Sequence, residues 1–184
     1  HTPINNLKVI VSGSTGGVGS LAVKLLSLLG AKVTTITGKK NSERYLYDLG
    51  SSKVINRKKF IDSTRLPLNN GVYDGAIDAV GGNILSSMLA SMQYNGIITA
   101  CGNVAGANFT TSVFPFILRK NRLIGIDSAT CSKPIREKIW NKFSTFWRLK
   151  NLDHICKTID LRSLDEEIKK MLRGEQVGRI VIRL

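Results

Sequence analysis

The chain has 184 residues, a length typical of one domain, and its 42% hydrophobic content is enough for a buried core. Lysine and arginine outnumber aspartate and glutamate by 27 to 13, and the resulting net charge of +14 favours anionic partners. No apolar run reaches the roughly 18 residues of a membrane span, and the opening HTPINNLK shows no secretory signal, so we expect a cytoplasmic protein.

The first patterned segment is an apolar run at residues 9–11, which predicts a buried parallel strand. A glycine-rich turn follows it, and residues 20–29 (SLAVKLLSLL) predict a helix. This arrangement is typical of a dinucleotide-binding corner, where the helix N-terminus directs free N–H groups at a pyrophosphate. In the pattern G-x-G-x-x-G, Ser14 replaces the first glycine, Gly16 would let the backbone approach the phosphates, and Gly19 would let the helix pack closely. A glycine-rich turn without a ligand is the alternative.

The second predicted strand, residues 32–37, ends where NAD-binding proteins place an acidic residue on the ribose 2′-hydroxyl. This chain has no acid there; it has Thr37, Gly38, Lys39 and Lys40. A hydroxyl and two cations suit a 2′-phosphate, and Arg57, just after a predicted third strand, could converge on it. We therefore predict NADP as the cofactor. The alternative is that these residues are solvated loop charges in a very basic protein.

The rest of the chain keeps an alternating pattern of strands and helices. Further strands are predicted at residues 53–55, 73–78, 97–101 and 123–127, and helices at residues 42–49, 83–92 and 112–118. Residues 62–71 are expected to be a turn-rich connection, and Asn95-Gly96 a tight break before the fifth strand. The fold class is therefore α/β, a Rossmann-type doubly wound parallel sheet of about six strands, with the ligand outside the carboxyl ends of the strands.

The carboxyl ends of the predicted strands supply the candidate site. We expect the dinucleotide to contact residues that follow the first five strands: Ser14, Thr15, Gly16, Gly17, Val18, Gly19, Thr37, Gly38, Lys39, Arg57, Val80, Gly81, Gly102 and Asn103. Each of these segments alone could be an ordinary turn. Their convergence at one edge of the sheet is the physical argument for a single binding crevice.

Cysteine usage and charge distribution narrow the functional classes. Cys101, Cys131 and Cys156 are odd in number and far apart, which indicates a reducing compartment and no zinc site. With only His1 and His154 besides, no metal centre is expected; Cys101 is expected to be a buried small residue. The basic residues are scattered, and we find no basic helix with interleaved aromatics, so nucleic acid is not the expected partner, although the charge leaves it open.

Several segments resemble the medium-chain dehydrogenase/reductase superfamily, most closely its zinc-free quinone-oxidoreductase branch, which includes acryloyl-CoA reductases. The resemblance rests on VSGSTGGVGSLAV (11–23), ITGKK (36–40), YLYDLG (45–50), DAVGGNILSSMLA (78–90), ACGN (100–103), FPFILR (114–119), LIGIDS (123–128) and VGRIVIRL (177–184). It implies NADPH-dependent hydride transfer to the C=C bond of an α,β-unsaturated carbonyl, in an enoyl thioester or a quinone. It also implies 2′-phosphate contacts from Thr37, Lys39 and Arg57, and a homodimer formed through the edge strand at residues 123–128.

The sequence also departs from this family. Members begin with a substrate domain that is missing here, so we expect residues 1–150 to form the NADP-binding Rossmann domain. Residues 151–184 would be a C-terminal segment, with a helix and a strand, that normally returns to the substrate domain; here it must pack elsewhere, be partly exposed or find a partner chain. Asn103 either donates a hydrogen bond to the nicotinamide carboxamide or caps its loop.

No catalytic residue is assigned, because the groups that polarise the substrate would lie mostly in the missing cleft, and the chain alone is expected to be inactive. Two other interpretations stay open. One is a non-catalytic basic Rossmann module serving as a structural or RNA-contacting subunit of a larger assembly; the other is a free-standing NADPH sensor.

Overall fold

The computed structural model describes residues 4–184; His1 and the two residues after it lie outside the described part. Six parallel strands form one sheet in the order β3-β2-β1-β4-β5-β6. The strands are β1 (Lys8–Val11), β2 (Lys32–Thr37), β3 (Lys53–Asn56), β4 (Tyr73–Asp78), β5 (Met92–Ala100) and β6 (Arg122–Gly125). This order and the helical connections make the fold a doubly wound Rossmann-type sheet, as the sequence predicted.

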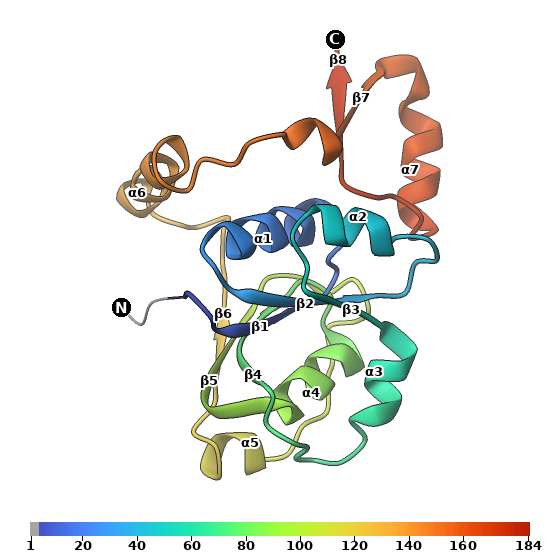
Figure 1. Ribbon diagram of the computed structural model, residues 1–184. Coiled ribbons are helices and arrows are strands. Elements are labelled where there is room, and N and C mark those ends of the chain that lie inside the picture. The colour runs from blue at the N-terminus through green and yellow to red at the C-terminus, as the bar shows by residue number, and fades with distance from the viewer. Residues whose placement is uncertain (1–3) are drawn as a thin grey trace.

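Helices cover both faces of the sheet, which is why the central strands β1 and β2 are buried at every position after the first. The five helices in this part are α1 (Gly17–Leu28), α2 (Glu43–Asp48), α3 (Arg57–Ser63), α4 (Gly82–Ala90) and the short α5 (Phe114–Ile117). Figure 1 shows α1 and α2 on one face and α3 and α4 on the other. Val23, Leu26 and Leu46 pack under the first pair, whereas Phe60 and Met88 pack under the second.

The remaining chain forms a smaller unit that lies beyond α1 and α2 (Figure 1). It consists of α6 (Lys133–Ser144), β7 (Cys156–Asp160), α7 (Leu164–Leu172) and β8 (Arg179–Arg183), with short 3-10 turns at Leu152–His154 and Leu161–Ser163. Strands β7 and β8 are parallel and form a separate two-stranded sheet. No helix within residues 4–184 is both long and apolar enough to cross a lipid bilayer.

The small unit is attached to the large sheet at a few points. Ile155 is 2% exposed and belongs to the core beneath α1 and α2. The N–H of Gly178 donates to the carbonyl oxygen of Thr15 at 2.8 Å, and within the small unit the N–H of Arg179 donates to the carbonyl oxygen of Ile155 at 2.8 Å. The C-terminal segment therefore packs on the glycine-rich turn after β1, one of the alternatives that the sequence left open.

Two expectations about local structure were wrong around the sheet. Strand β5 begins at Met92 and runs through Asn95 and Gly96, where a break was expected; Asn95 has a φ of 63°, and the register with β4 shifts nearby. Part of the expected loop before β4 is helix α3, which starts at Arg57. Asn56 begins this helix because its side-chain oxygen accepts hydrogen bonds from the N–H groups of Lys58 and Lys59.

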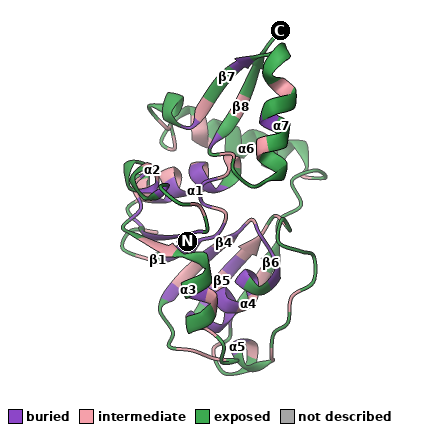
Figure 2. Cartoon of the chain, turned by 90° about the vertical axis from the view of Figure 1, so that its right-hand side faces the viewer, coloured by how far each residue is buried: buried purple, intermediate pink, exposed green. Residues whose placement is uncertain are grey.

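The expectation that no basic helix carries interleaved aromatics was also wrong. Helix α6 combines Lys and Arg residues with Trp140 and Phe143, and Phe146 and Trp147 follow directly after it. None of its residues is buried (Figure 2). The ring of Phe143 lies 5.9 Å from that of Trp140 and 5.7 Å from that of Trp147.

Candidate functional site

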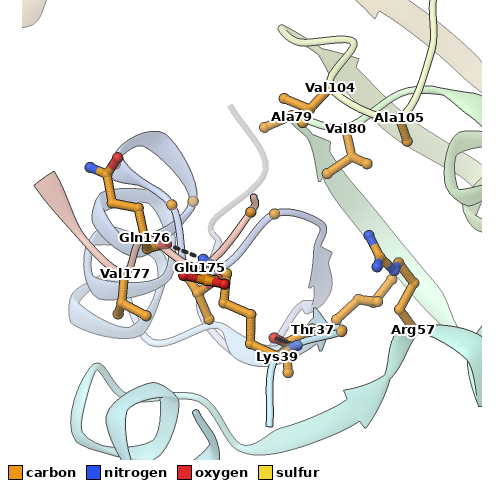
Figure 3. A pocket seen from close by; sticks show the side chains of 18 of the residues that line it. Thr37, Lys39, Arg57, Ala79, Val80, Val104, Ala105, Glu175, Gln176 and Val177 are labelled. Carbon is orange, nitrogen blue, oxygen red and sulfur yellow. Dashed lines mark hydrogen bonds between the residues drawn. The ribbon is translucent and has the colours of Figure 1, made fainter. Parts of the chain in front are cut away.

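One cavity of about 800 Å³ lies at the carboxyl ends of the strands (Figure 3). Turns after β1 to β5 and the loop before β8 form its wall, so segments far apart in the sequence meet there. Cofactor pockets are typically about 300–1,000 Å³ in volume. Most residues predicted to contact a dinucleotide line this cavity: Thr15, Gly16, Gly17, Val18, Gly19, Thr37, Gly38, Lys39, Arg57 and Val80.

The N-terminus of α1 faces the cavity without a cap. Gly16 precedes the helix, no side chain caps it, and its first turn carries no acidic residue. Within residues 4–184, the first N–H groups of α1 therefore remain available to an anion. A Cβ atom at Gly19 would lie 2.2 Å from the carbonyl oxygen of Gly13, so only glycine lets the helix pack this closely on the turn.

The turn after β2 brings cations to the same cavity. The Thr37 hydroxyl is buried, accepts a hydrogen bond from the N–H of Lys39 at 3.1 Å, and lies 3.2 Å from the Ser42 hydroxyl. Thr37 therefore fixes the shape of the turn. A Cβ atom at Gly38 would lie 2.7 Å from the guanidinium of Arg57, so Arg57 lies against the backbone of this turn.

Lys39 crosses the cavity toward the C-terminal unit. Its ammonium group donates a hydrogen bond to the carbonyl oxygen of Gln176, as the dashed line in Figure 3 shows. Burial of this side chain lowers the pKa of Lys39 below its usual value. The cation is thus partly desolvated and held by a neutral acceptor.

The turn after β4 is organised by Asp78, which the sequence analysis did not select. This carboxylate is fully buried; it accepts hydrogen bonds from the Ser12 hydroxyl at 2.5 Å and from the N–H groups of Val80 at 3.2 Å and Gly81 at 2.9 Å. It therefore fixes the backbone that places Val80 on the cavity wall. The available signal was an acidic residue at a strand end, separated from Val-Gly-Gly by a single alanine.

The loops after β4 and β5 pack against each other too closely for side chains. A Cβ atom at Gly81 would lie 2.6 Å from the carbonyl oxygen of Gly106, and one at Gly102 would lie 2.4 Å from that of Ala79. Gly81 therefore lies behind the cavity wall. Ser14 is also fully buried behind it, and its hydroxyl donates to the carbonyl oxygen of Ile36 at 2.9 Å.

A second, shallower hollow of about 530 Å³ lies beyond the ends of β5 and β6. Gly102 and Asn103 line this hollow, together with Ile126 and Asp127, and neither lines the main cavity. The side chain of Asn103 is exposed. The predicted site residues are thus divided between two hollows at the same edge of the sheet, except for Ser14 and Gly81, which line neither.

Arg179 is a further cation at the glycine-rich turn that sequence reasoning missed. A Cβ atom at Gly17 would lie 3.1 Å from its guanidinium, so this group lies beside the first turn of α1. The segment VGRIVIRL was noted only as a closing motif. Its role at the turn depends on the path of the C-terminal unit, which sequence spacing does not reveal.

Cys101 is exposed, in contrast to the expectation that it would be buried. It follows β5 and lies at the open second hollow. Partial burial and the nearby charge of Asp78 raise the pKa of its thiol, which makes it a weak nucleophile. Within residues 4–184, no three His, Cys, Asp or Glu side chains are grouped to hold a metal ion.

Comparison with known proteins shows to which family the chain belongs. The model of a family described as zinc-binding dehydrogenase matches residues 17–151. Acrylyl-CoA reductase AcuI of Ruegeria pomeroyi is 32% identical over 174 residues, covering 95% of this chain and 53% of that protein. Bacillus subtilis YhfP is 36% identical over 177 residues, covering 96% of this chain and 54% of that protein.

Solved structures agree with the sequence relatives. Escherichia coli K-12 YhdH with bound NADPH has a TM-score of 0.91 and 34% identity, over 98% of this chain and 55% of that one. The structure of Bacillus subtilis YhfP with NAD bound has a TM-score of 0.90 and 35% identity, over 97% and 54% of the two chains. The chain spans about half the length of the curated relatives that it matches. It belongs to the zinc-binding dehydrogenase family, within the medium-chain dehydrogenase/reductase superfamily that its motifs resembled.

Proposed function

We propose that this chain is the coenzyme-binding part of an NADPH-dependent reductase that acts on the C=C bond of an α,β-unsaturated carbonyl. One observation carries the proposal: an uncapped helix N-terminus and the cations Lys39 and Arg57 face one cavity of dinucleotide size. The bound NADPH of YhdH and the activity in the name of AcuI support it. Because YhfP was crystallised with NAD, the choice of NADPH rests mainly on the cations of this chain.

The residues of the chain would divide the work of holding the cofactor. The first turn of α1, Gly16 and Arg179 would bind the pyrophosphate, because N–H groups and a guanidinium meet there. Lys39 and Arg57 would bind the 2′-phosphate. We place the nicotinamide near Val80 and the second hollow, where the exposed Asn103 amide could hold its carboxamide.

When bound, the reduced nicotinamide supplies the hydride for the carbon–carbon double bond, in an enoyl thioester or a quinone. The chain itself contributes position: it fixes the cofactor on rigid strand ends and covers part of it with the loop before β8. No residue among 4–184 is assigned a catalytic role here. We propose that the groups polarising the substrate carbonyl come from a substrate domain, and that the chain alone is inactive.

The same substrate domain would explain the exposed apolar side chains of the C-terminal unit. Met171, Leu172 and Val181 are 55%, 81% and 44% exposed. We propose that residues 151–184 pack on such a domain, and that α6 belongs with this segment rather than with residues 1–150, because its apolar side chains are exposed as well.

The edge of the large sheet supports a proposal about assembly. Strand β6 is an edge strand of the large sheet; Ile124 within it and Ile126 just after it are 42% and 49% exposed. Unpaired apolar edges are avoided in folded proteins. We propose a homodimer in which residues 123–128 pair with their copy, and cytoplasmic location because the three cysteines are unpaired.

The test is a binding titration with NADPH and NADH, by calorimetry. The account predicts tighter binding of NADPH, and Lys39→Ala or Arg57→Ala should weaken it about 10- to 100-fold, since a charge-assisted hydrogen bond contributes about 1.5–3 kcal/mol. Affinity for NADH should change little in both variants. Absence of NADPH binding by the folded chain would contradict the proposed function.

Helix α6 favours one alternative, an RNA-contacting module without catalysis. Lys138 and Lys142 alternate with Trp140 and Phe143 on an exposed helix, a composition that suits single-stranded nucleic acid. RNA binding that falls steeply with salt, in a chain that binds no NADPH, would support this alternative over the reductase.

A further inference from the structure

Residues 173–178 connect α7 to β8 and lie across the main cavity; we call this segment the strap. All six of its residues line the cavity that Lys39 and Arg57 also line. The strap is mostly exposed on its outer side, with only Gly178 buried. Its position makes it part of the wall at the proposed 2′-phosphate end.

The strap is fastened firmly at its β8 end. Gly178 has a φ of 70°, and a Cβ atom there would lie 2.1 Å from the carbonyl oxygen of Ile155. Its N–H donates to the carbonyl oxygen of Thr15 at 2.8 Å. This end therefore cannot shift without separating the C-terminal unit from the glycine-rich turn.

The α7 end has more freedom. Gly174 has a φ of 72° and has open space where a Cβ atom would be. The N–H of Glu175 donates to the carbonyl oxygen of Lys170 at 2.9 Å, and its carboxylate pairs with Arg173 at 3.0 Å, so these bonds stay within α7 and the strap. Both bonds span Gly174, so a rotation about its backbone would break them, but neither resists a movement of α7 and the strap together.

Between these ends, the Lys39 ammonium holds the strap through the carbonyl oxygen of Gln176. Within the described residues, no other hydrogen bond joins Gln176 or Val177 to the large sheet. A phosphate dianion is a stronger acceptor than a neutral carbonyl, because both partners of the hydrogen bond are then charged. The ammonium has three N–H donors but a single positive charge, so drawing it toward a phosphate weakens its bond to the Gln176 carbonyl.

We propose that the strap competes with the 2′-phosphate of NADPH for Lys39, and that NADPH releases the strap whereas NADH leaves it fastened. This inference rests on the proposed function of the cavity. The Gln176 carbonyl is then a specificity determinant. It accepts the hydrogen bond of Lys39 when no 2′-phosphate is present, and the loss of this bond adds to the free-energy cost of binding NADPH. Because the strap continues into α7, the identity of the bound dinucleotide is transmitted to the C-terminal unit.

The first test needs no ligand. Hydrogen exchange of the Gly178 amide should be about fivefold faster in Lys39→Met than in the wild type, as the loss of about 1 kcal/mol predicts. Lys40→Met is the matched control, because Lys40 lines the same cavity and makes no hydrogen bond to the strap among the described residues. Equal exchange in both variants and the wild type would overturn the fastening by Lys39.

The second test slackens the strap with two glycines inserted after Gly174. If the strap competes for Lys39, NADPH should bind about fivefold more tightly to this variant while the affinity for NADH stays unchanged. The same insertion after Lys150, in the exposed connection following α6, is the control. If the wild type binds NADPH and the slack variant shows the same ratio of NADPH to NADH affinity, the competition for Lys39 is overturned and the proposed function stands. If the wild type does not bind NADPH, the proposed function is overturned, and the competition for Lys39 with it.

Discussion

The large sheet and the C-terminal unit are built from similar proportions of apolar residues but bury them very differently. Val11 and Ile98 of the sheet, and Leu46 and Met88 of the helices that cover it, are fully buried. In residues 126–184, the buried positions are few: Ile155, Ile159, Glu167 and Gly178. The sheet therefore carries its own stability, whereas the C-terminal unit depends on a few attachments and presents apolar side chains outward. This difference is what a module shaped to meet a further domain would show.

The largest expected effect is a difference in the free energy of unfolding between a substitution in the large sheet's core and one in the C-terminal unit. Leu46→Ala should destabilise the chain by about 2–5 kcal/mol, because it leaves a cavity beneath α2. Leu172→Ala, at an 81% exposed position, should change the free energy of unfolding by less than about 0.5 kcal/mol. Urea unfolding of the two variants measures both values, and a cost above 2 kcal/mol for Leu172→Ala would contradict the comparison.

The next effect concerns the attachment of the C-terminal unit. Gly178→Ala should detach it, because the new Cβ atom would meet the carbonyl oxygen of Ile155 and the backbone has a positive φ. The φ of Gly174 is also positive, but a Cβ atom there would meet open space. Gly174→Ala therefore measures the backbone strain alone, about 1 kcal/mol. Limited proteolysis should cleave residues 156–184 rapidly only in Gly178→Ala. Equal cleavage in both variants would show that the attachment at Gly178 contributes nothing.

The smallest effect is a dependence on pH inside the C-terminal unit. The Glu167 side chain is 8% exposed and bonds to Lys157 at 2.6 Å and to Lys170 at 2.9 Å, and these hydrogen bonds lower the pKa of its carboxyl group. Because the folded-state pKa is lowered, the stabilisation is present above the unfolded value of about 4.3 and is lost as the pH falls through the folded value. We expect the NMR methyl signals of Ile159 to shift as the pH falls below about 4.

The large sheet should keep its own signals over the same pH range. Glu167→Gln, which cannot ionise, is the control: its Ile159 signals should not change with pH. A wild type with pH-independent Ile159 signals would contradict the structural role of this ion pair.

The sequence predicted the sheet well because its signals are local. Strands β2 and β4 have the predicted bounds, since each lies between glycine-containing turns. Helix α6 was missed although Ser132, Pro134 and the spacing of Ile135, Ile139 and Phe143 are ordinary signals of a helix start and an apolar face. The basic residues between them make the segment resemble scattered surface charge in the sequence.

The site was predictable only in its local parts. The turns after β1 and β2 can be recognised from residues that are adjacent in the sequence. Most of the predicted residues therefore line one cavity. Gln176 and Arg179 were not predictable, because they reach Lys39 and Gly17 through the path of the C-terminal unit. The buried role of the Thr37 hydroxyl depends on Ser42, which the phosphate interpretation did not consider.

The most direct test of the central claim isolates the 2′-phosphate with ligand fragments. Adenosine 2′,5′-bisphosphate, adenosine 3′,5′-bisphosphate and adenosine 5′-monophosphate should be titrated into the chain by calorimetry at physiological salt. The account predicts that the 2′,5′-bisphosphate binds at least about tenfold more tightly than the other two, and that Lys39→Met removes this preference. Equal binding of the two bisphosphates would show that only the net positive charge attracts them, and would contradict a built 2′-phosphate site.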